Sequence, residues 1–452
     1  MLAAVICILA FVACYMAGRR SLGLGLVTLL TVGYFYGILR ANLITAFSHF
    51  IFDAGMIGLF LSPCWRTKDP VEKKKSETVR LWTILLMAWP VLLIALPFQP
   101  LLISLVGLRG NIFFLPLLLI GSRLKEKDLI QLSVGMAVLD MVAVAFGGAE
   151  YFLGVPRFFP FSSVTLIMYS SGDVAGGFLR IPGTFTSAHA FGGTMVGSLP
   201  YIIGLWARAK KNSHRILTII ALPVALLGVL MSATRTNFVF ASAMIIFAGF
   251  TAKMTGKQRA AFLLVLGMVG YAAVSNARFQ RFQSLKDTEF VTERIAGSVN
   301  RGFWEILSEY PMGNGLGGGG TSIPYFLEGQ VRNPVSMENE YARILSEQGI
   351  IGLLMWVSFV IWVCTRFRTA FAKGPWSPSR RLVWCLVMIS LATAFLGTGA
   401  FTSIPGTLLM VLGIGWTAVP DVSPLSAEPE RVRLQVERPR RNYGGISVAQ
   451  RP

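Results

Sequence analysis

The sequence predicts an all-α membrane protein: a polytopic bundle of about 12–13 transmembrane helices with a large periplasmic loop before the last three. Three observations lead to this fold class. Of the 452 residues, 54% are hydrophobic and 14% are charged, whereas soluble proteins carry about a quarter charged residues. The apolar residues come in long blocks. Most positive charges lie in alternate connections between those blocks.

The apolar blocks approach or reach the ~20 residues that a helix needs to cross a bilayer. The block at 101–122 is interrupted by Arg109-Gly110-Asn111. The first block follows no basic segment and runs directly into a second, so we expect a retained helix and no cleaved signal peptide. The blocks occupy residues 2–17, 22–38, 41–61, 81–98, 101–122, 129–147, 187–206, 215–232, 236–252, 260–275, 348–365, 382–398 and 403–418.

The net charge of +19 indicates how the chain is oriented in the membrane and not a surface that binds nucleic acid. Basic connections stay in the cytoplasm, so we expect them and the C-terminus inside, with the N-terminus outside. These connections are 19–20, 66–80, 123–127, 208–215, 253–259, 366–381 and the tail from residue 431.

The basic residues expected outside are nearly all arginine. A guanidinium binds phosphate or carboxylate through a planar fork, which lysine lacks. We therefore expect several of them to bind an anionic group. They are Arg40, Arg109, Arg157, Arg180, Arg235, Arg278, Arg281, Lys286, Arg294, Arg301, Arg332 and Arg343.

The predicted organisation is a membrane domain over 1–418 and a disordered cytoplasmic tail over 419–452, which is rich in Pro, Arg, Glu and Ser. Two outer segments, 148–186 and 276–347, are longer than connectors need to be. We expect function on this outer, periplasmic face, because the inner connections are short and basic.

Two segments before the large loop contain candidate ligands. In "FLRIPGTFTSAHAFGG" (178–193), Arg180 precedes a turn and His189 stands where the next helix begins. His189 is either a ligand or an interfacial histidine bonded to a loop carbonyl. In "MSATRTNFVF" (231–240), Arg235 lies at a tight helix hairpin, either near a lipid-linked phosphate or as a snorkelling anchor.

The large outer segment contains further arginines and "PMGNGLGGGG" (311–320), whose backbone N–H groups suit an anion and whose glycines also suit a hinge. It ends in "ENEYARILSEQGIIGLLMW" (338–356). Ser336 or Asn339 is expected to cap a helix that begins near Glu340. Capping does not explain three polar residues at 338–340. Glu347 is expected to be structural and paired with an arginine.

These segments together resemble the O-antigen ligase and O-antigen polymerase superfamily of bacterial membrane glycosyltransferases. "ENEYARILSEQGIIG" resembles the family's His-Asn-x-Tyr/Phe-Leu followed by Glu-x-Gly, two aliphatic residues and Gly. "PMGNGLGGGG" resembles its Pro-x-Gly-x-Gly stretch, "SATRTNFVF" its Ser-x-x-Arg turn, and "RIPGTFTSAHAFG" its Arg-x-x-Gly-Thr-Phe segment. The matches cover about 180–352 in the family's order.

The resemblance implies glycosyl transfer at the periplasmic face, from a glycan on undecaprenyl diphosphate to a sugar hydroxyl, without metal or other cofactor. The sequence also lacks a convincing outer Asp/Glu metal cluster. Glu338 stands where ligases carry a proposed histidine base, which favours the polymerase branch. Glu338 would act as base, with His189 as the alternative, and Asn339 would orient Glu338 or the sugar. The residues expected at the diphosphate are Arg180, Arg235, Arg278, Arg281, Arg301 and His189.

Two other functions remain open. A ligase would transfer a finished glycan to a lipid or protein. A transporter of anions or lipid-linked glycans would carry charged residues deep in its spans, and His49 and Asp53 are the candidate pair, which we expect instead to be a buried hydrogen-bonded pair on one helix face. The expected partners are the donor, a saccharide acceptor, membrane lipid and a regulator of chain length, and not nucleic acid.

Overall fold

The structure, a computed structural model, describes residues 1–420 except 68, 170–178, 252–255, 257–259, 261–266, 268–269, 272–288, 290–291, 293–302, 321–322, 336, 338 and 398. Within these residues all regular structure is helical and there is no strand. Seven helical segments are long and apolar enough to cross a membrane, as a multi-pass membrane protein requires. They are α1 (Leu2–Arg20), α2 (Leu22–Asn42), Leu101–Gly121, α8 (Glu126–Leu153), α10 (Ala188–Arg208), α11 (Asn212–Met231) and α16 (Glu340–Thr365).

The other predicted blocks form shorter helices or lie outside the described residues. The block at 41–61 is a 3-10 helix, η1 (Ala46–Phe50), continued by α3 (Ile51–Leu61). Most of 260–275 is outside the described residues. The predicted number of 12–13 spans therefore stays a prediction. The remaining short apolar helices are α5 (Glu77–Leu93), α12 (Arg235–Thr251), α18 (Ser377–Thr393) and α19 (Gly406–Ala418).

The interruption predicted at Arg109-Gly110-Asn111 lies a few residues later. Helix α6 (Leu101–Ile112) continues through all three residues, and α7 (Pro116–Gly121) follows a turn at 113–115. The polar side chains of Arg109 and Asn111 are tolerated in this apolar helix because carboxylates of other helices, Asp53 and Glu347, accept their hydrogen bonds. Pro116, which has no backbone N–H, begins the second helix.

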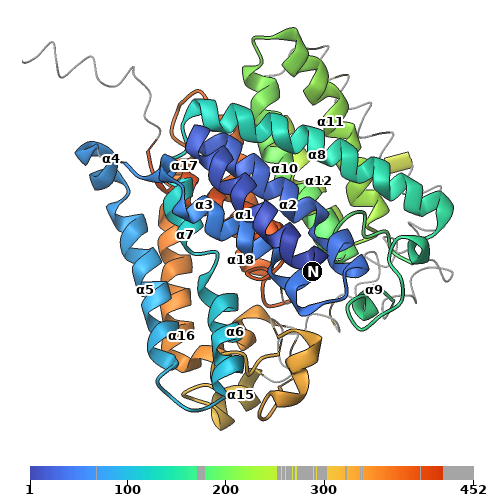
Figure 1. Ribbon diagram of the computed structural model, residues 1–452. Helices are drawn as coiled ribbons and strands as arrows, with labels where there is room; N and C mark the ends of the chain where they lie inside the picture. The colour runs from blue at the N-terminus through green and yellow to red at the C-terminus, as the bar shows by residue number, and fades with distance from the viewer. Residues whose placement is uncertain are drawn as a thin grey trace, which may run out of the picture.

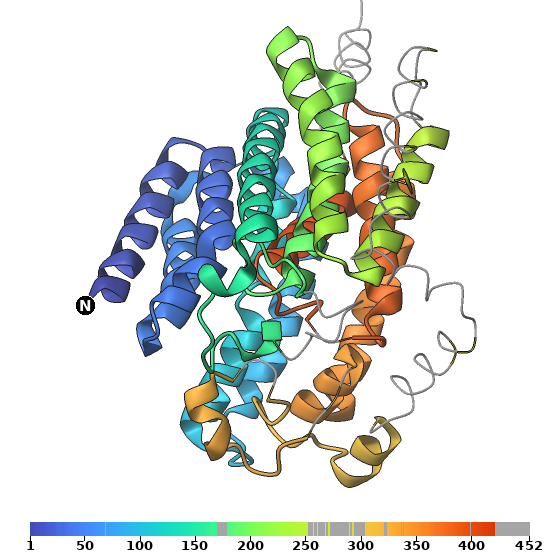
Figure 2. The same cartoon turned by 90° about the vertical axis from the view of Figure 1, so that its right-hand side faces the viewer.

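Contacts between distant connections gather the basic segments at one end of the bundle. Arg208, at the end of α10, pairs with Glu126 at the start of α8. The backbone N–H of Gly23 donates to Asp128, and Arg380 donates to the carbonyl of Val419 at 2.6 Å. Figure 2 shows the α10–α11 connection at this end and the N-terminus at the opposite end. We call the two ends the basic end and the outer end.

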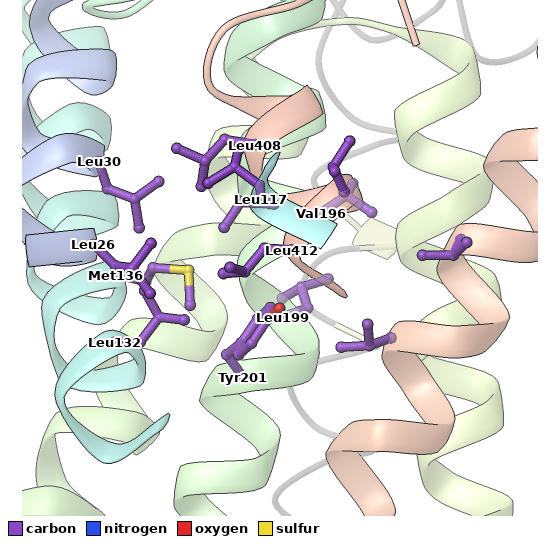
Figure 3. Close-up of a cluster of buried hydrophobic side chains, with 14 of the residues drawn as sticks. Leu26, Leu30, Leu117, Leu132, Met136, Val196, Leu199, Tyr201, Leu408 and Leu412 are labelled. Atoms are coloured by element: carbon purple, nitrogen blue, oxygen red, sulfur yellow. The ribbon is translucent and has the colours of Figure 1, made fainter. Parts of the chain in front are cut away.

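The core lies where α10 packs against α8, α11, α12, α18 and α19. Its buried side chains come from helices far apart in the sequence (Figure 3). Leu26 and Leu30 of α2, Leu132 and Met136 of α8, and Leu199 of α10 belong to this one cluster. This packing makes α10 the central helix, so the residues at its first turn are held firmly at the outer end.

The outer end is extended by α5, α6 and the first part of α16, which lie together with α15 (Phe303–Glu309) in Figures 1 and 2. The connection before α16 also contains η5 (Tyr325–Gln330). After α16 come the short α17 (Phe367–Ala370), α18 and α19. The large loop predicted over 276–347 lies in good part outside the described residues and stays a prediction. Other short helices are η2 (Pro63–Trp65), α4 (Pro70–Lys75), η3 (Val155–Arg157) and α9 (Leu166–Tyr169).

Helix α16 is broken at Gly349, and the glycine-rich segment fills the break. Gly349 has φ 68° and ψ −172°, a conformation open almost only to glycine. The N–H of Ile350 donates to the carbonyl of Pro311 at 2.9 Å, and the N–H of Asn314 donates to that of Ser346 at 2.6 Å. Two segments that the sequence singled out separately therefore form one unit.

We predict that Gly349→Ala destabilises the protein by at least about 1–3 kcal/mol, because an L-residue is strained in this conformation. The added Cβ would also lie 2.6 Å from the carbonyl carbon of Met312. Thermal unfolding of the detergent-purified protein measures the effect. Gly329→Ala is the matched control, since a Cβ there meets no atom within 4 Å. Equal melting temperatures for the two variants would contradict the prediction.

Candidate functional site

Arg180 lies in the connection before α10, and that connection is fixed to two helices. The N–H of Ile38 in α2 donates to the carbonyl of Thr184 at 3.0 Å. The N–H of Gly183 donates to the Glu150 carboxylate of α8 at 2.8 Å. The chain passes so close to α2 that a Cβ on Gly37 would lie 2.0 Å from the carbonyl carbon of Phe185. Arg180 is therefore held by a rigid support.

The structure brings Arg180, His189 and Arg235 together from two separate segments. Nη1 of Arg180 lies 2.9 Å from Nε2 of His189, in the first turn of α10. Arg235 begins α12, and its charge acts on Arg180. Burial first, and this like charge second, lower the pKa of the Arg180 guanidinium. We call these three residues the Arg180 cluster.

The tight turn before α12 sets the place of Arg235. Ala233 has a positive φ of 47°, and the Ser232 and Thr234 hydroxyls are 2.9 Å apart. Asn237 donates its side-chain N–H to the carbonyl of His189 at 3.1 Å, which ties α12 to the start of α10. The Arg180 cluster is thus built on helix ends, where two neighbouring guanidinium groups favour an anion between them.

The first part of α16 contains a buried ion-pair network around Arg343. This side chain is 1% exposed. It donates to Glu340 at 2.7 Å and to Glu347 at 2.9 Å. Asn111 of α6 donates to Glu347 at 2.6 Å. The second oxygen of Glu340 accepts the N–H of Gly399 at 2.7 Å. The predicted pairing of Glu347 with an arginine is confirmed, and the network joins three parts of the outer end.

Asn339 caps α16, as expected, and the helix begins at Glu340. Its side-chain oxygen accepts the N–H groups of Tyr341 at 2.9 Å and Ala342 at 3.2 Å. Asn339 and Glu340 are both buried, so each has a structural task in this helix start. Four other predicted site residues lie outside the described residues: Glu338, Arg278, Arg281 and Arg301.

The predicted hydrogen-bonded pair of His49 and Asp53 is wrong. Asp53 binds Arg109 of α6 instead, through two bonds of which the longer is 2.7 Å. His49 lies in η1 and not in the helix of Asp53. The spacing rule that places residues four apart on one face does not apply across a change from 3-10 to α-helix.

Sequence reasoning missed two buried carboxylates in α8. Asp140 accepts hydrogen bonds from the hydroxyls of Tyr34 at 2.7 Å and Ser198 at 2.5 Å, which links α8 to α2 and α10. Glu150 holds the Arg180 connection through Gly183. Each is an isolated acidic residue in an apolar part of α8. An isolated carboxylate in a membrane helix is expected to have a partner, so this feature could have identified both residues from the sequence.

Fold and site together define a multi-pass helical membrane protein with clustered arginines at one end of its bundle. A comparison with family models and with curated proteins finds no match to the sequence. The functional argument therefore rests on the residues and their geometry.

We predict that Arg343→Met destabilises the protein by about 3–5 kcal/mol, because two buried carboxylates lose their counter-charge. The control is Arg208→Met, which removes a half-exposed ion pair with Glu126 and is expected to cost under about 1 kcal/mol. Denaturant or thermal unfolding in detergent compares the two variants. Similar losses for both would show that the Arg343 network does not anchor the outer end.

Proposed function

We propose that this protein is a polysaccharide polymerase of the bacterial inner membrane, which joins undecaprenyl-diphosphate-linked repeat units at the periplasmic face. The observation that carries this proposal is the Arg180 cluster. Two guanidinium groups and an imidazole meet at helix ends, at the end of the bundle opposite the basic connections. A lipid-linked diphosphate at a membrane surface presents the charge that such a cluster binds.

In the proposed reaction, a sugar hydroxyl of the acceptor attacks the anomeric carbon of the donor. The bond between that carbon and the diphosphate oxygen breaks, and undecaprenyl diphosphate leaves. Arg180 and Arg235, with one or more of Arg278, Arg281 and Arg301, would hold the diphosphate and stabilise the charge of the leaving group. The reaction then needs no metal ion, because guanidinium groups supply the positive charge.

Glu338 would accept the proton of the attacking hydroxyl. It directly precedes Asn339, whose side chain caps α16, and the positive end of a helix keeps a neighbouring carboxylate ionised. The side-chain oxygen of Asn339 is engaged as the helix cap, which disfavours its direct contact with sugar. His189 is the alternative proton acceptor, but it already contacts Arg180.

The nearest alternative is a ligase that transfers a glycan to a lipid or protein. It would use the same donor contacts, so only the acceptor separates the two. A transporter is less favoured, because the carboxylates deep in the described helices have partners that explain them as packing. Asp140 binds two hydroxyls, and Asp53 binds Arg109.

We predict that the purified protein, given a synthetic undecaprenyl-diphosphate repeat unit and EDTA, makes a ladder of polymers. Glu338→Gln and Arg235→Lys abolish long polymer, because the first removes the base and the second the bidentate contact. Glu328→Gln and Arg157→Lys are controls that change exposed residues of the outer connections. Gel electrophoresis reads the product, and membrane levels of each variant are checked by blotting.

Each other result has a defined meaning. A normal ladder from either variant removes that residue from its proposed role. Single transfer to an added lipid or protein acceptor, with no ladder, assigns the protein as a ligase. A ladder lost in EDTA and restored by a divalent metal ion contradicts the metal-free mechanism.

The direct attack on the donor carbon also predicts inversion of the anomeric configuration. An α-linked donor should give a β-linked polymer, and a β-linked donor an α-linked one. One-bond carbon–proton couplings in the NMR spectrum of the product distinguish them. Retention of configuration would instead require a covalent intermediate or a different path.

A further inference from the structure

A second group of polar side chains surrounds the Tyr36 hydroxyl near the outer end of α2. This hydroxyl donates to the carbonyl of His49 at 3.1 Å. Arg40 follows one turn later in α2, and Arg109 approaches from α6. The positive charges of both arginines reach Tyr36 and the His49 ring. We call Arg40, His49 and Arg109 the α2 cluster.

Two members of the α2 cluster have buried polar atoms without a partner. Nε of Arg40 and Nε2 of His49 form no hydrogen bond with any described residue. His49 is only 7% exposed. Buried polar groups in native proteins are almost always hydrogen-bonded, so the unpartnered Nε2 of the buried His49 ring is open to a polar ligand.

The charge of the α2 cluster favours an anion. Asp53 balances Arg109 by accepting Nε and one Nη group, which leaves three N–H groups of that guanidinium for other contacts. Arg40 forms no ion pair with a described residue. The cluster therefore carries about one uncompensated positive charge.

Apolar side chains beside the α2 cluster suit a lipid-linked anion. Between α2 and α3, Ile44, Phe47 and Phe50 are 50%, 58% and 43% exposed. Tyr325 and Phe326 of η5 place their rings 6.0 and 5.5 Å from the His49 ring. Cationic side chains next to exposed apolar side chains suit an amphiphile with an anionic head group better than a free inorganic ion.

We propose that the α2 cluster binds the diphosphate of a second lipid-linked saccharide, the acceptor. This inference rests on the proposed function and deepens it. Polymerisation joins two molecules that each carry a diphosphate. Only the donor loses the bond between its anomeric carbon and its diphosphate, which leaves as undecaprenyl diphosphate. The acceptor's diphosphate stays intact, a whole repeat unit away from the attacking hydroxyl, so the Arg180 cluster cannot hold both.

The fold places the two clusters next to each other on α2. The connection that contains Arg180 packs on α2 at Gly37 and Ile38. Tyr36 and Arg40 lie on the neighbouring face of the same helix. Two lipid-linked substrates would then enter on adjacent sides of one rigid helix.

Binding stoichiometry tests the second site independently of activity. Native mass spectrometry of the full chain in detergent, with undecaprenyl diphosphate, should show two lipids bound to the wild type and one to Arg40→Gln or His49→Gln. Undecaprenol, which lacks the charge, should show none. Arg157→Gln, an exposed arginine of the outer end, should retain two. One lipid on the wild type, or two on both cluster variants, overturns the proposal.

Kinetics test which substrate the α2 cluster holds. The donor carries no acceptor hydroxyl, and the acceptor is either lipid-linked or a methyl glycoside of the same repeat unit. Arg40→Gln should raise KM for the lipid-linked acceptor roughly ten- to hundredfold, the loss of one charged hydrogen bond, and leave the methyl glycoside unchanged. Equal effects on both acceptors overturn the assignment. Two bound lipids without transfer to either acceptor support the second site and contradict the polymerase.

Discussion

The buried guanidinium of Arg343 is the interaction on which the outer end depends. A charge with 1% exposure is tolerable only when partners surround it. Those partners come from its own helix, Glu340 and Glu347, and from Asn111 of α6. Glu340 in turn accepts the N–H of Gly399. Satisfying one charge therefore aligns the first part of α16, α6 and the connection between α18 and α19.

This constraint also explains why α16 breaks where it does. The last residues before Gly349 are held by the Arg343 network and by Trp89, which donates to the carbonyl of Gln348 at 2.9 Å. The helix after Gly349 follows the apolar bundle. Backbone groups of 311–314 satisfy N–H and carbonyl groups that the break exposes. The loop before α16 is thus fixed by its own backbone.

The apolar blocks predicted most of the helices, because the length and composition of a segment are enough to indicate a membrane span. The cap at Asn339 was also predictable from local chemistry. Contacts between distant segments were not predictable in this way. Asp53 forms its ion pair with Arg109, 56 residues away, and not with its neighbour His49. A local pattern cannot rank partners that only tertiary packing supplies. Asp140 and Glu150 show the same limit, since each looked like an isolated charge until a distant hydroxyl or N–H satisfied it.

The contacts of Asn339 and Glu340 bear on which carboxylate near the start of α16 could act as the base. Asn339 is occupied as a cap, and both oxygens of Glu340 are occupied, one by Arg343 and one by Gly399. A buried carboxylate with both oxygens engaged in this way is not available to a sugar hydroxyl. Asn339 and Glu340 thus have structural partners, and Glu338, which lies outside the described residues, stays the proposed base. The described contacts also separate two of the arginines: Arg343 stabilises the fold through two buried carboxylates, whereas Arg180 contacts the imidazole of His189. The described contacts of Arg180 include no carboxylate, and this difference makes the Arg180 cluster the place where substrate binding is proposed.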